Sequence, residues 1–273
     1  MGNLLLVLII LFIVGFYFWS IMPHNNKGHR QVLINYAKWD YAHRGLWDNE
    51  LNIPENSFSA FERAMRQKVA IELDVRLTKD KKLVVFHDNS LKRLCGVPGI
   101  VGNKTYREIS SLRLNGTDEP IPLLSQVLHE VRGRVPLLID LKSNGSDTSI
   151  SSYVLRELEF YTGEYMIQSF NPFALRWFRK NAPQVLTGQL AGSYNTMKGL
   201  NPILRLAFFL LIINAISRPD FVSYDLQAID CLSLRIVHSL YKTPVFIWTA
   251  RNINDYRQAR ALYSSAIFEK FIP

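Results

Sequence analysis

Short apolar runs alternate with helix-compatible segments from residue 38 to the end of this chain. Eight of the runs have the length and composition of buried strands, and segments with helical periodicity separate most of them. The predicted strands are Asp40–His43, Ala70–Val75, Val135–Leu141, Tyr165–Ser169, Val185–Leu190, Phe221–Tyr224, Pro244–Thr249 and Ala266–Glu269. The predicted helices are Ser57–Gln67, Leu123–Glu130, Ser149–Tyr161, Pro172–Asn181, Pro202–Ile216, Leu232–Tyr241 and Ile253–Tyr263. This alternation across residues 38–273 favours an α/β fold, a single (β/α)8 (TIM) barrel, over an open sheet.

One further apolar run, Leu83–His87, does not fit the alternation, because only a short polar stretch separates it from Ala70–Val75. Parallel strands need a crossover of about a dozen residues or more, so the two runs are predicted to form an antiparallel hairpin. A turn centred on Asp80 and Lys81 would place Asp74 opposite His87. The region that follows, about residues 88–122, is long for a structureless connection and is predicted to be a small insertion after the second strand.

The N-terminus has the composition of a membrane segment. Residues 1–23 contain no Asp, Glu, Lys, Arg or His, and a membrane span needs about 20 apolar residues. Tyr17 and Trp19 suit a membrane interface. A basic start and a small-residue cleavage site, which mark a cleaved signal peptide, are both missing. We therefore expect a transmembrane helix in residues 1–23 acting as an uncleaved anchor, a polar tether in 24–37, and the barrel in 38–273.

The distribution of charge favours a cytoplasmic barrel. The first charged side chains after the span are Lys27, Arg30 and Lys38, and basic residues flank spans mainly on the cytoplasmic side. Cys95 and Cys231 match no zinc motif and cannot build a disulfide framework, which agrees with a reducing compartment. The net charge is +9, yet no basic stripe or reader motif for nucleic acid is present. Attraction to anionic membrane lipid and to phosphodiester substrates explains the charge better.

The candidate site residues lie at the carboxyl ends of predicted strands, where (β/α)8 barrels carry their catalytic groups. Glu72 and Asp74 are two residues apart on one strand and therefore point to the same face, as do Asp140 and Lys142 on another. Three carboxylates on one rim repel each other unless a cation lies between them. Oxygen ligands of this kind predict a divalent metal ion, Mg²⁺ or Ca²⁺. The full set is His43, Arg44, Glu72, Asp74, His87, Asp140, Lys142 and Trp248.

The remaining candidates suit attack at phosphorus. His43 and His87 can act as general acid and base near neutral pH, and Arg44 and Lys142 add positive charge for a phosphate. Taken alone, a buried histidine is more often an ordinary core residue, and a Glu-x-Asp pair is more often solvated or salt-bridged. The grouping of all these side chains at strand ends favours a site.

Several motifs resemble the glycerophosphodiester phosphodiesterase family. They are Ala42-His43-Arg44-Gly45, Pro54-Glu55-Asn56-Ser57, Ile71-Glu72-Leu73-Asp74-Val75, Val85-Phe86-His87-Asp88, Ile121-Pro122-Leu123, Leu138-Ile139-Asp140-Leu141-Lys142, Ser169-Phe170 and Trp248-Thr249. The resemblance implies a barrel with a small insertion and a metal-dependent hydrolase that releases glycerol phosphate and an alcohol. It implies that His43 and His87 form the acid–base pair, that Glu72, Asp74 and Asp140 bind the metal, and that Arg44 and Lys142 contact the phosphate. Trp248 could then pack against the glycerol carbons.

Some positions depart from the family pattern. Asp140 stands where the family usually has Glu, which puts direct metal ligation there in doubt. The family's Trp-Thr-x-Asn becomes Trp248-Thr249-Ala250-Arg251-Asn252, which leaves the Asn without an assigned role. The family's closing strand usually ends in a loop that contains Asp, whereas this chain has Phe268-Glu269-Lys270, and Glu269 is a weak further candidate. Because both histidines are present, an inactive barrel is not favoured.

Two functional alternatives stay open from the sequence. One is a lysophospholipase D or another phospholipid phosphodiesterase on the same barrel. The other, less favoured, is a non-catalytic membrane-bound binding protein. The apolar segment Leu206–Ile216 could pack on the barrel or lie in a membrane interface. The sequence does not indicate a protein partner, nor which histidine is the acid.

Overall fold

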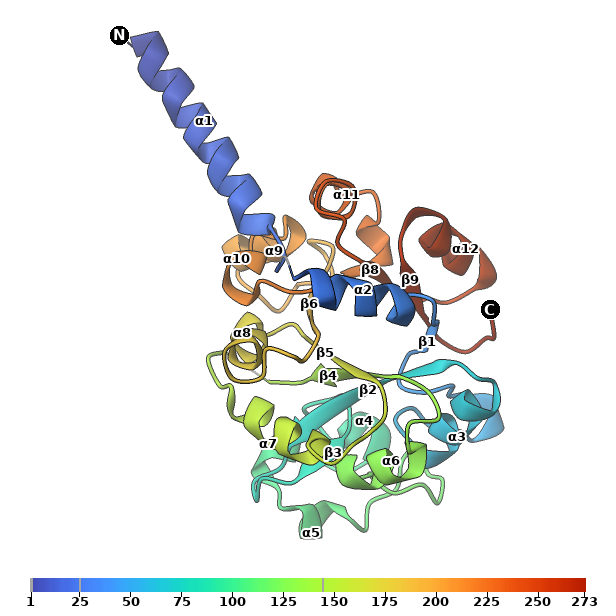
Figure 1. Cartoon of the computed structure of the whole chain (residues 1–273). Helices are drawn as coiled ribbons and strands as arrows, with labels where there is room; N and C mark the ends of the chain where they lie inside the picture. The colour runs from blue at the N-terminus through green and yellow to red at the C-terminus, as the bar shows by residue number, and fades with distance from the viewer. Residues whose placement is uncertain (1, 25, 144) are drawn as a thin grey trace.

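Eight parallel strands close into a barrel in the computed structural model, which describes residues 2–24, 26–143 and 145–273 (Figure 1). They are β1 (Tyr41–Ala42), β2 (Ala70–Leu77), β4 (Leu137–Leu141), β5 (Tyr165–Ser169), β6 (Thr187–Ala191), β7 (Phe221–Asp225), β8 (Val245–Ala250) and β9 (Ser265–Phe268). β1 pairs with both β2 and β9, and this double pairing closes the barrel. The predicted (β/α)8 architecture is confirmed.

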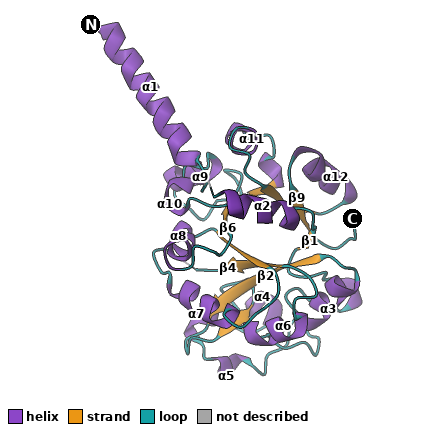
Figure 2. Ribbon diagram, viewed as in Figure 1, coloured by secondary structure: helices purple, strands orange, loops and turns teal. Residues whose placement is uncertain are grey.

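Helices surround the strands, as Figure 2 shows. They are α3 (Phe58–Arg66), α6 (Leu124–Val131), α7 (Ser149–Leu158), α8 (Pro172–Asn181), α9 (Pro202–Phe209), α10 (Asn214–Ser217), α11 (Leu232–Ser239) and α12 (Ile253–Leu262). Side chains just before the first turn cap several of them; Ser57 Oγ, for example, accepts from the amide of Ala60. The predicted helix Pro202–Ile216 is divided into α9 and α10, because the backbone at Leu211 has a positive φ of 59° that a helix cannot contain.

The short strand β3 (Leu83–Val85) pairs antiparallel with β2, so the predicted hairpin is present. Its predicted register is wrong by one residue. Val75 pairs with Val85, and the Phe86 amide donates to the Asp74 carbonyl, so Phe86 rather than His87 lies opposite Asp74. The Thr78 hydroxyl accepts a hydrogen bond from the Lys82 amide, so these two residues lie opposite each other across the turn. The centre of the turn is therefore Asp80, rather than the midpoint between Asp80 and Lys81.

The insertion after β3 has a small core of its own. It contains the short helices α4 (Lys92–Cys95) and α5 (Tyr106–Ile109) and a 3-10 turn at Val101–Asn103; two further 3-10 turns, Asn49–Leu51 and Leu226–Ala228, follow β1 and β7. Leu94, Ile109 and Leu114 pack there against Val84 and Phe86. The insertion is therefore held against the hairpin beside the carboxyl end of β2.

Helix α1 (Gly2–Ile21) is the one helix in the described residues that is long and apolar enough to cross a membrane. Most of its apolar side chains are exposed, but its last turn docks on the barrel, where Ile21 is fully buried. Arg218, which follows α10, donates to the carbonyls of Trp19 and Met22 at 2.5 and 2.9 Å. Tyr17 donates to Ser233 on α11. Figure 1 shows the rest of α1 projecting away from the barrel.

A second N-terminal helix, α2 (Lys27–Tyr36), occupies most of the segment for which the sequence predicts a polar tether. Asn26 caps its first turn, and Leu33 and Tyr36 are buried. These two side chains pack against residues at the amino ends of the strands, among them Ala70 and Phe221, and so close that end of the barrel. The helix is hard to recognise in the sequence because few of its ten residues are apolar.

We expect Leu33→Ala to lower the free energy of unfolding by about 2–5 kcal/mol, since the change removes a buried side chain from the floor of the barrel. Val32→Ala is the matched control, because Val32 lies next to it on α2 but is 46% exposed. Denaturant unfolding of the full-length protein in detergent measures both. Equal effects would contradict the assignment of α2 as a packed cap.

Candidate active site

Three buried carboxylates meet at the carboxyl ends of β2 and β4. Glu72 and Asp74 lie on β2, and Asp140 on β4 is the direct neighbour of Asp74 in the parallel pairing of these strands. Each is at most 2% exposed, and one oxygen from each of the three lies within 4.8 Å of the others. The predicted carboxylate cluster therefore exists as a geometric unit.

The loop after β1 brings Arg44 to this cluster. Arg44 has a left-handed backbone (φ 60°), which aims its amide at Glu72 Oε2, 2.9 Å away. Its guanidinium donates to Glu55 at 2.7 Å and lies 3.4 Å from Asp74. Gly45 follows with a φ of 78°, and a Cβ there would come within 2.9 Å of the Ala60 side chain. The tight turn against α3 thus requires glycine at position 45.

Lys142 partly compensates the negative charge. Its Nζ lies 2.9 Å from Asp74 and also donates to Asp140. Although burial opposes ionisation of Asp74, the charge of Lys142 and then that of His87 hold its pKa well below the usual range. Glu72 behaves in the opposite way, because burial and then the charges of Asp74 and Asp140 raise its pKa well above the usual range. The protein's own cations therefore leave the cluster incompletely neutralised.

The cluster fits a divalent ion. Asp140 Oδ1 is buried and accepts no hydrogen bond from the described part of the chain, while Lys142 occupies the other oxygen of that carboxylate. Such an unsatisfied buried oxygen is costly unless a ligand meets it. The converging donors are all carboxylate oxygens, the ligands that Mg²⁺ and Ca²⁺ prefer.

Each candidate histidine is oriented by a carboxylate. His43 Nδ1 lies 2.9 Å from Glu269 Oε2, and His87 Nδ1 lies 2.7 Å from Asp88 Oδ1. When Nδ1 donates to the carboxylate, Nε2 carries the lone pair and is the nitrogen that can exchange a proton with substrate. Burial and then the neighbouring charge of Arg44 lower the pKa of His43, which favours its neutral form.

Several side chains at the site were not predicted to act there. Glu55 binds both Arg44 and Arg93, Asn56 donates to Asp74 at 2.8 Å, and Gln168 on β5 lies 3.4 Å from Glu72. Glu55 and Asn56 belong to one of the motifs that resemble the family, and that motif is the sequence feature from which their place at the site could have been predicted. Arg93 lies in the insertion, where nothing in the sequence connects it to Glu55.

Trp248 lies on β8, and its ring is edge-on to Phe170, with centroids 5.8 Å apart. Asn252 caps α12 by accepting from the amides of Asn254 and Asp255, which gives this previously unassigned residue a structural role. Glu269, the weak candidate, contacts both His43 and Arg251.

Comparison with known proteins identifies the family of this chain. Residues 43–269 match the sequence model of the glycerophosphoryl diester phosphodiesterase family. The chain belongs to this family. A glycerophosphodiester phosphodiesterase from Caldanaerobacter subterraneus is 35% identical over 161 residues, which cover 55% of this chain and 65% of the relative. A lysophospholipase D from Rattus norvegicus is also 35% identical, over 43% of this chain and 40% of its own length. The alignments with the first curated relatives thus span less than two thirds of those proteins.

Solved structures share the fold of this family member. A glycerophosphodiester phosphodiesterase from Thermotoga maritima has a TM-score of 0.64 at 25% identity, covering 84% of this chain and 94% of that one. A phosphodiesterase from Oleispira antarctica, solved with the product sn-glycerol-3-phosphate, has a TM-score of 0.68 at 19% identity, covering 85% and 92%. These matches cover most of the chain and agree with the barrel fold.

We expect Glu269→Gln to lower kcat at least about tenfold, because His43 loses the charge that orients it. The Glu269 hydrogen bond raises the pKa of His43, so its loss moves the corresponding limb of the pH–rate profile to lower pH. A shifted acidic limb identifies His43 as the base, and a shifted alkaline limb identifies it as the acid. Glu159→Gln, at an exposed position on the outer surface, should leave the profile unchanged. An unaltered profile in Glu269→Gln would contradict this coupling.

Proposed function

We propose that this protein hydrolyses glycerophosphodiesters to glycerol phosphate and a free alcohol. The observation that carries the proposal is the buried cluster of Glu72, Asp74 and Asp140, because an oxygen-only site at the carboxyl rim of a barrel suits a divalent ion and a phosphate. Membership of the family supports the same reaction. Bound to these three residues, Mg²⁺ or Ca²⁺ would polarise a phosphoryl oxygen and offset its charge.

The other side chains at the carboxyl rim of the barrel bind the phosphate and transfer protons. Arg44 and Lys142 bind the phosphate oxygens, and their ion pairs with Asp74 keep both groups positioned before substrate arrives. One histidine takes the proton of the nucleophile, which is either the glycerol 2-hydroxyl or water, as its oxygen bonds to phosphorus. The other histidine gives a proton to the leaving alcohol oxygen as the bond from that oxygen to phosphorus breaks. Attack by water gives glycerol phosphate directly. Attack by the 2-hydroxyl gives a cyclic phosphate, which water then opens to glycerol phosphate with the two histidines in exchanged roles. Trp248 packs against the glycerol carbons.

We expect His43→Ala and His87→Ala each to lower kcat by about 10²–10⁴-fold, since each removes one partner of the proton transfer. Release of choline from glycerophosphocholine measures turnover, and circular dichroism shows that the variants remain folded. The matched control is His129→Gln, because His129 is exposed on α6. Wild-type turnover in either alanine variant would refute the acid–base assignment.

We also propose that α1 is an uncleaved anchor that holds the barrel close to the cytoplasmic face of a membrane. The docking of its last turn supports this, because Ile21 is buried and Arg218 binds two carbonyls at the end of α1. Removal of α1 would expose this surface. Lys27 and Arg30, which follow the span, favour the cytoplasmic orientation.

A lysophospholipid is the second candidate substrate, and the surface of α9 favours it. Phe208, Leu211 and Ile213 are buried in the core, so most of the segment Leu206–Ile216 packs on the barrel. Ile203 and Leu206 on α9 are 81% and 47% exposed. Ring contacts from Phe208 to Phe170 and from Phe170 to Trp248 connect this helix with the rim. An apolar surface there would suit a substrate with an acyl chain.

We expect the double variant Ile203→Ser/Leu206→Ser to reduce kcat/KM for micellar lysophosphatidylcholine several-fold, because the change removes apolar contact with lipid. The kcat/KM for soluble glycerophosphocholine should stay unchanged, because neither substitution alters a rim residue. Leu262→Ser is the matched control, because Leu262 on α12 is also 47% exposed. Equal losses on both substrates, or no loss on either, would contradict a lipid-facing role for α9.

A further inference from the structure

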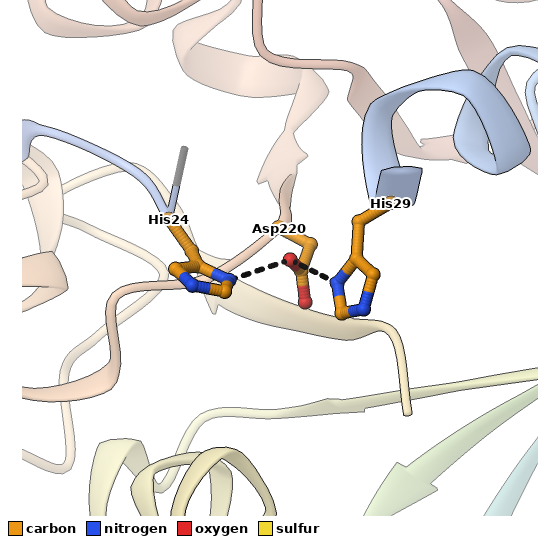
Figure 3. Close-up of side chains that lie close together, drawn as sticks. All are labelled: His24, His29 and Asp220. Carbon is orange, nitrogen blue, oxygen red and sulfur yellow. Dashed lines mark hydrogen bonds and ion pairs between the residues drawn. The ribbon is translucent and has the colours of Figure 1, made fainter. Parts of the chain in front are cut away.

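A second cluster of metal-ligand side chains lies at the opposite end of the barrel from the carboxylates. It consists of His24, His29 and Asp220, and one donor atom from each lies within 4.8 Å of the others. His24 precedes α2, His29 is in the first turn of α2, and Asp220 immediately precedes β7. Figure 3 shows the two imidazole rings on either side of the Asp220 carboxylate.

Both rings direct the same atom at the same oxygen. His29 Nδ1 lies 2.7 Å and His24 Nδ1 3.2 Å from Asp220 Oδ1. The ring planes are close to perpendicular, at 80°, with centroids 5.8 Å apart, so the two nitrogens approach the oxygen from different directions. Donors around a tetrahedral zinc ion with bonds of about 2.0 Å lie about 3.3 Å apart. The cluster is therefore close to the spacing that a metal ion requires.

Asp220 is held in the orientation of a ligand. Its side chain is only 4% exposed, and its second oxygen, Oδ2, accepts from the amide of Thr187 at 2.9 Å and from the Thr187 hydroxyl at 3.2 Å. Metal-binding carboxylates are commonly fixed in this way by hydrogen bonds from a neighbouring group. Oδ1 is consequently left facing the imidazoles, and the carboxylate cannot turn away without breaking two hydrogen bonds.

We propose that His24, His29 and Asp220 form a second metal site, specific for Zn²⁺ or a similar transition-metal ion. Two imidazole nitrogens and one carboxylate oxygen are a zinc-type donor set, whereas the oxygen-only cluster at the other end of the barrel suits Mg²⁺ or Ca²⁺. The His24 side chain is 31% exposed, so water can reach the fourth position.

Metal binding requires a change of tautomer in the rings and a small shift of His29 away from Asp220, from 2.7 Å to the donor spacing of about 3.3 Å. Each neutral imidazole moves its proton from Nδ1, where it bonds to Asp220, to Nε2, and the Nδ1 lone pair then faces the ion. The ionised carboxylate supplies Oδ1, so the site carries one negative charge for a divalent cation. No oxidant or other reactant is needed.

The ion would act as a clasp between the N-terminal segment and the barrel. Asp220 is 196 residues from His24 and 191 from His29 in the sequence. His24 lies three residues after the end of α1 at Ile21, and α2 closes the barrel floor through Leu33. A bound ion would therefore fix both the anchor and the floor helix to the strand end at Asp220.

The test uses the full-length protein in detergent, stripped of metal and titrated with Co²⁺ and Zn²⁺. We expect one Co²⁺ per chain to give the intense visible absorption of tetrahedral coordination, and Zn²⁺ to displace it. His24→Gln and His29→Gln should each lose this absorption and bind Zn²⁺ at least about tenfold more weakly. His24→Gln is the safer variant for folding, because its side chain is partly exposed. His238→Gln is the matched control, since His238 is partly buried on α11 and its Nδ1 lies 3.2 Å from the backbone carbonyl of Thr243.

Two outcomes would overturn the proposal. In one, the wild-type protein gives no tetrahedral Co²⁺ spectrum. In the other, the histidine variants lose thermal stability in metal-free buffer, while Zn²⁺ adds no stability to the wild type; the cluster would then be a hydrogen-bonded contact only. Asp140→Asn should keep the Co²⁺ spectrum, because Asp140 lies at the opposite end of the barrel. The test of this second metal site is therefore independent of the test of the proposed hydrolysis.

Discussion

The convergence of three buried carboxylates at one rim is the constraint on which the rest of this structure depends. Parallel pairing of β2 and β4 places Asp74 beside Asp140, and the two-residue period of a strand adds Glu72 on the same face. Burial makes this concentration of charge expensive. Two interactions stabilise the buried negative charge. Lys142 lies between the carboxylates of Asp74 and Asp140, and the amide of Arg44 donates a hydrogen bond to Glu72. Burial and then the charges of Asp74 and Asp140 raise the pKa of Glu72, and a divalent ion would offset that negative charge.

The two ends of the barrel have different tasks. At the carboxyl end, polar side chains converge on the carboxylate cluster. The insertion contributes Arg93, which donates to Glu55, and Glu55 also accepts from Arg44. The amino end is closed by Leu33 and Tyr36 of α2 and receives the docked end of α1. The apolar N-terminal helix is therefore joined to the barrel at the end opposite the carboxylate cluster.

Much of the fold and of the site could be predicted from the sequence, because buried strands and their terminal side chains have strong local patterns. The strand Tyr165–Ser169 and the helix Pro172–Asn181 were predicted to the residue. The hairpin register was wrong because a Thr78 hydroxyl decides it, and α2 was missed because its burial depends on contacts distant in sequence, such as Leu33 with Phe221. Arg93 was missed for the same reason. The roles of the site residues remain predictions.

Product analysis by phosphorus NMR tests the central claim most directly. The full-length protein in detergent would be incubated with glycerophosphocholine in Mg²⁺, in Ca²⁺ and after chelation, alongside Asp140→Asn. The account predicts a glycerol phosphate signal that requires one of the two ions and that, in the variant, needs a higher ion concentration, because the variant loses one charged oxygen of the cluster. Hydrolysis that continues at full rate in chelator, or no glycerol phosphate with either ion, would contradict it.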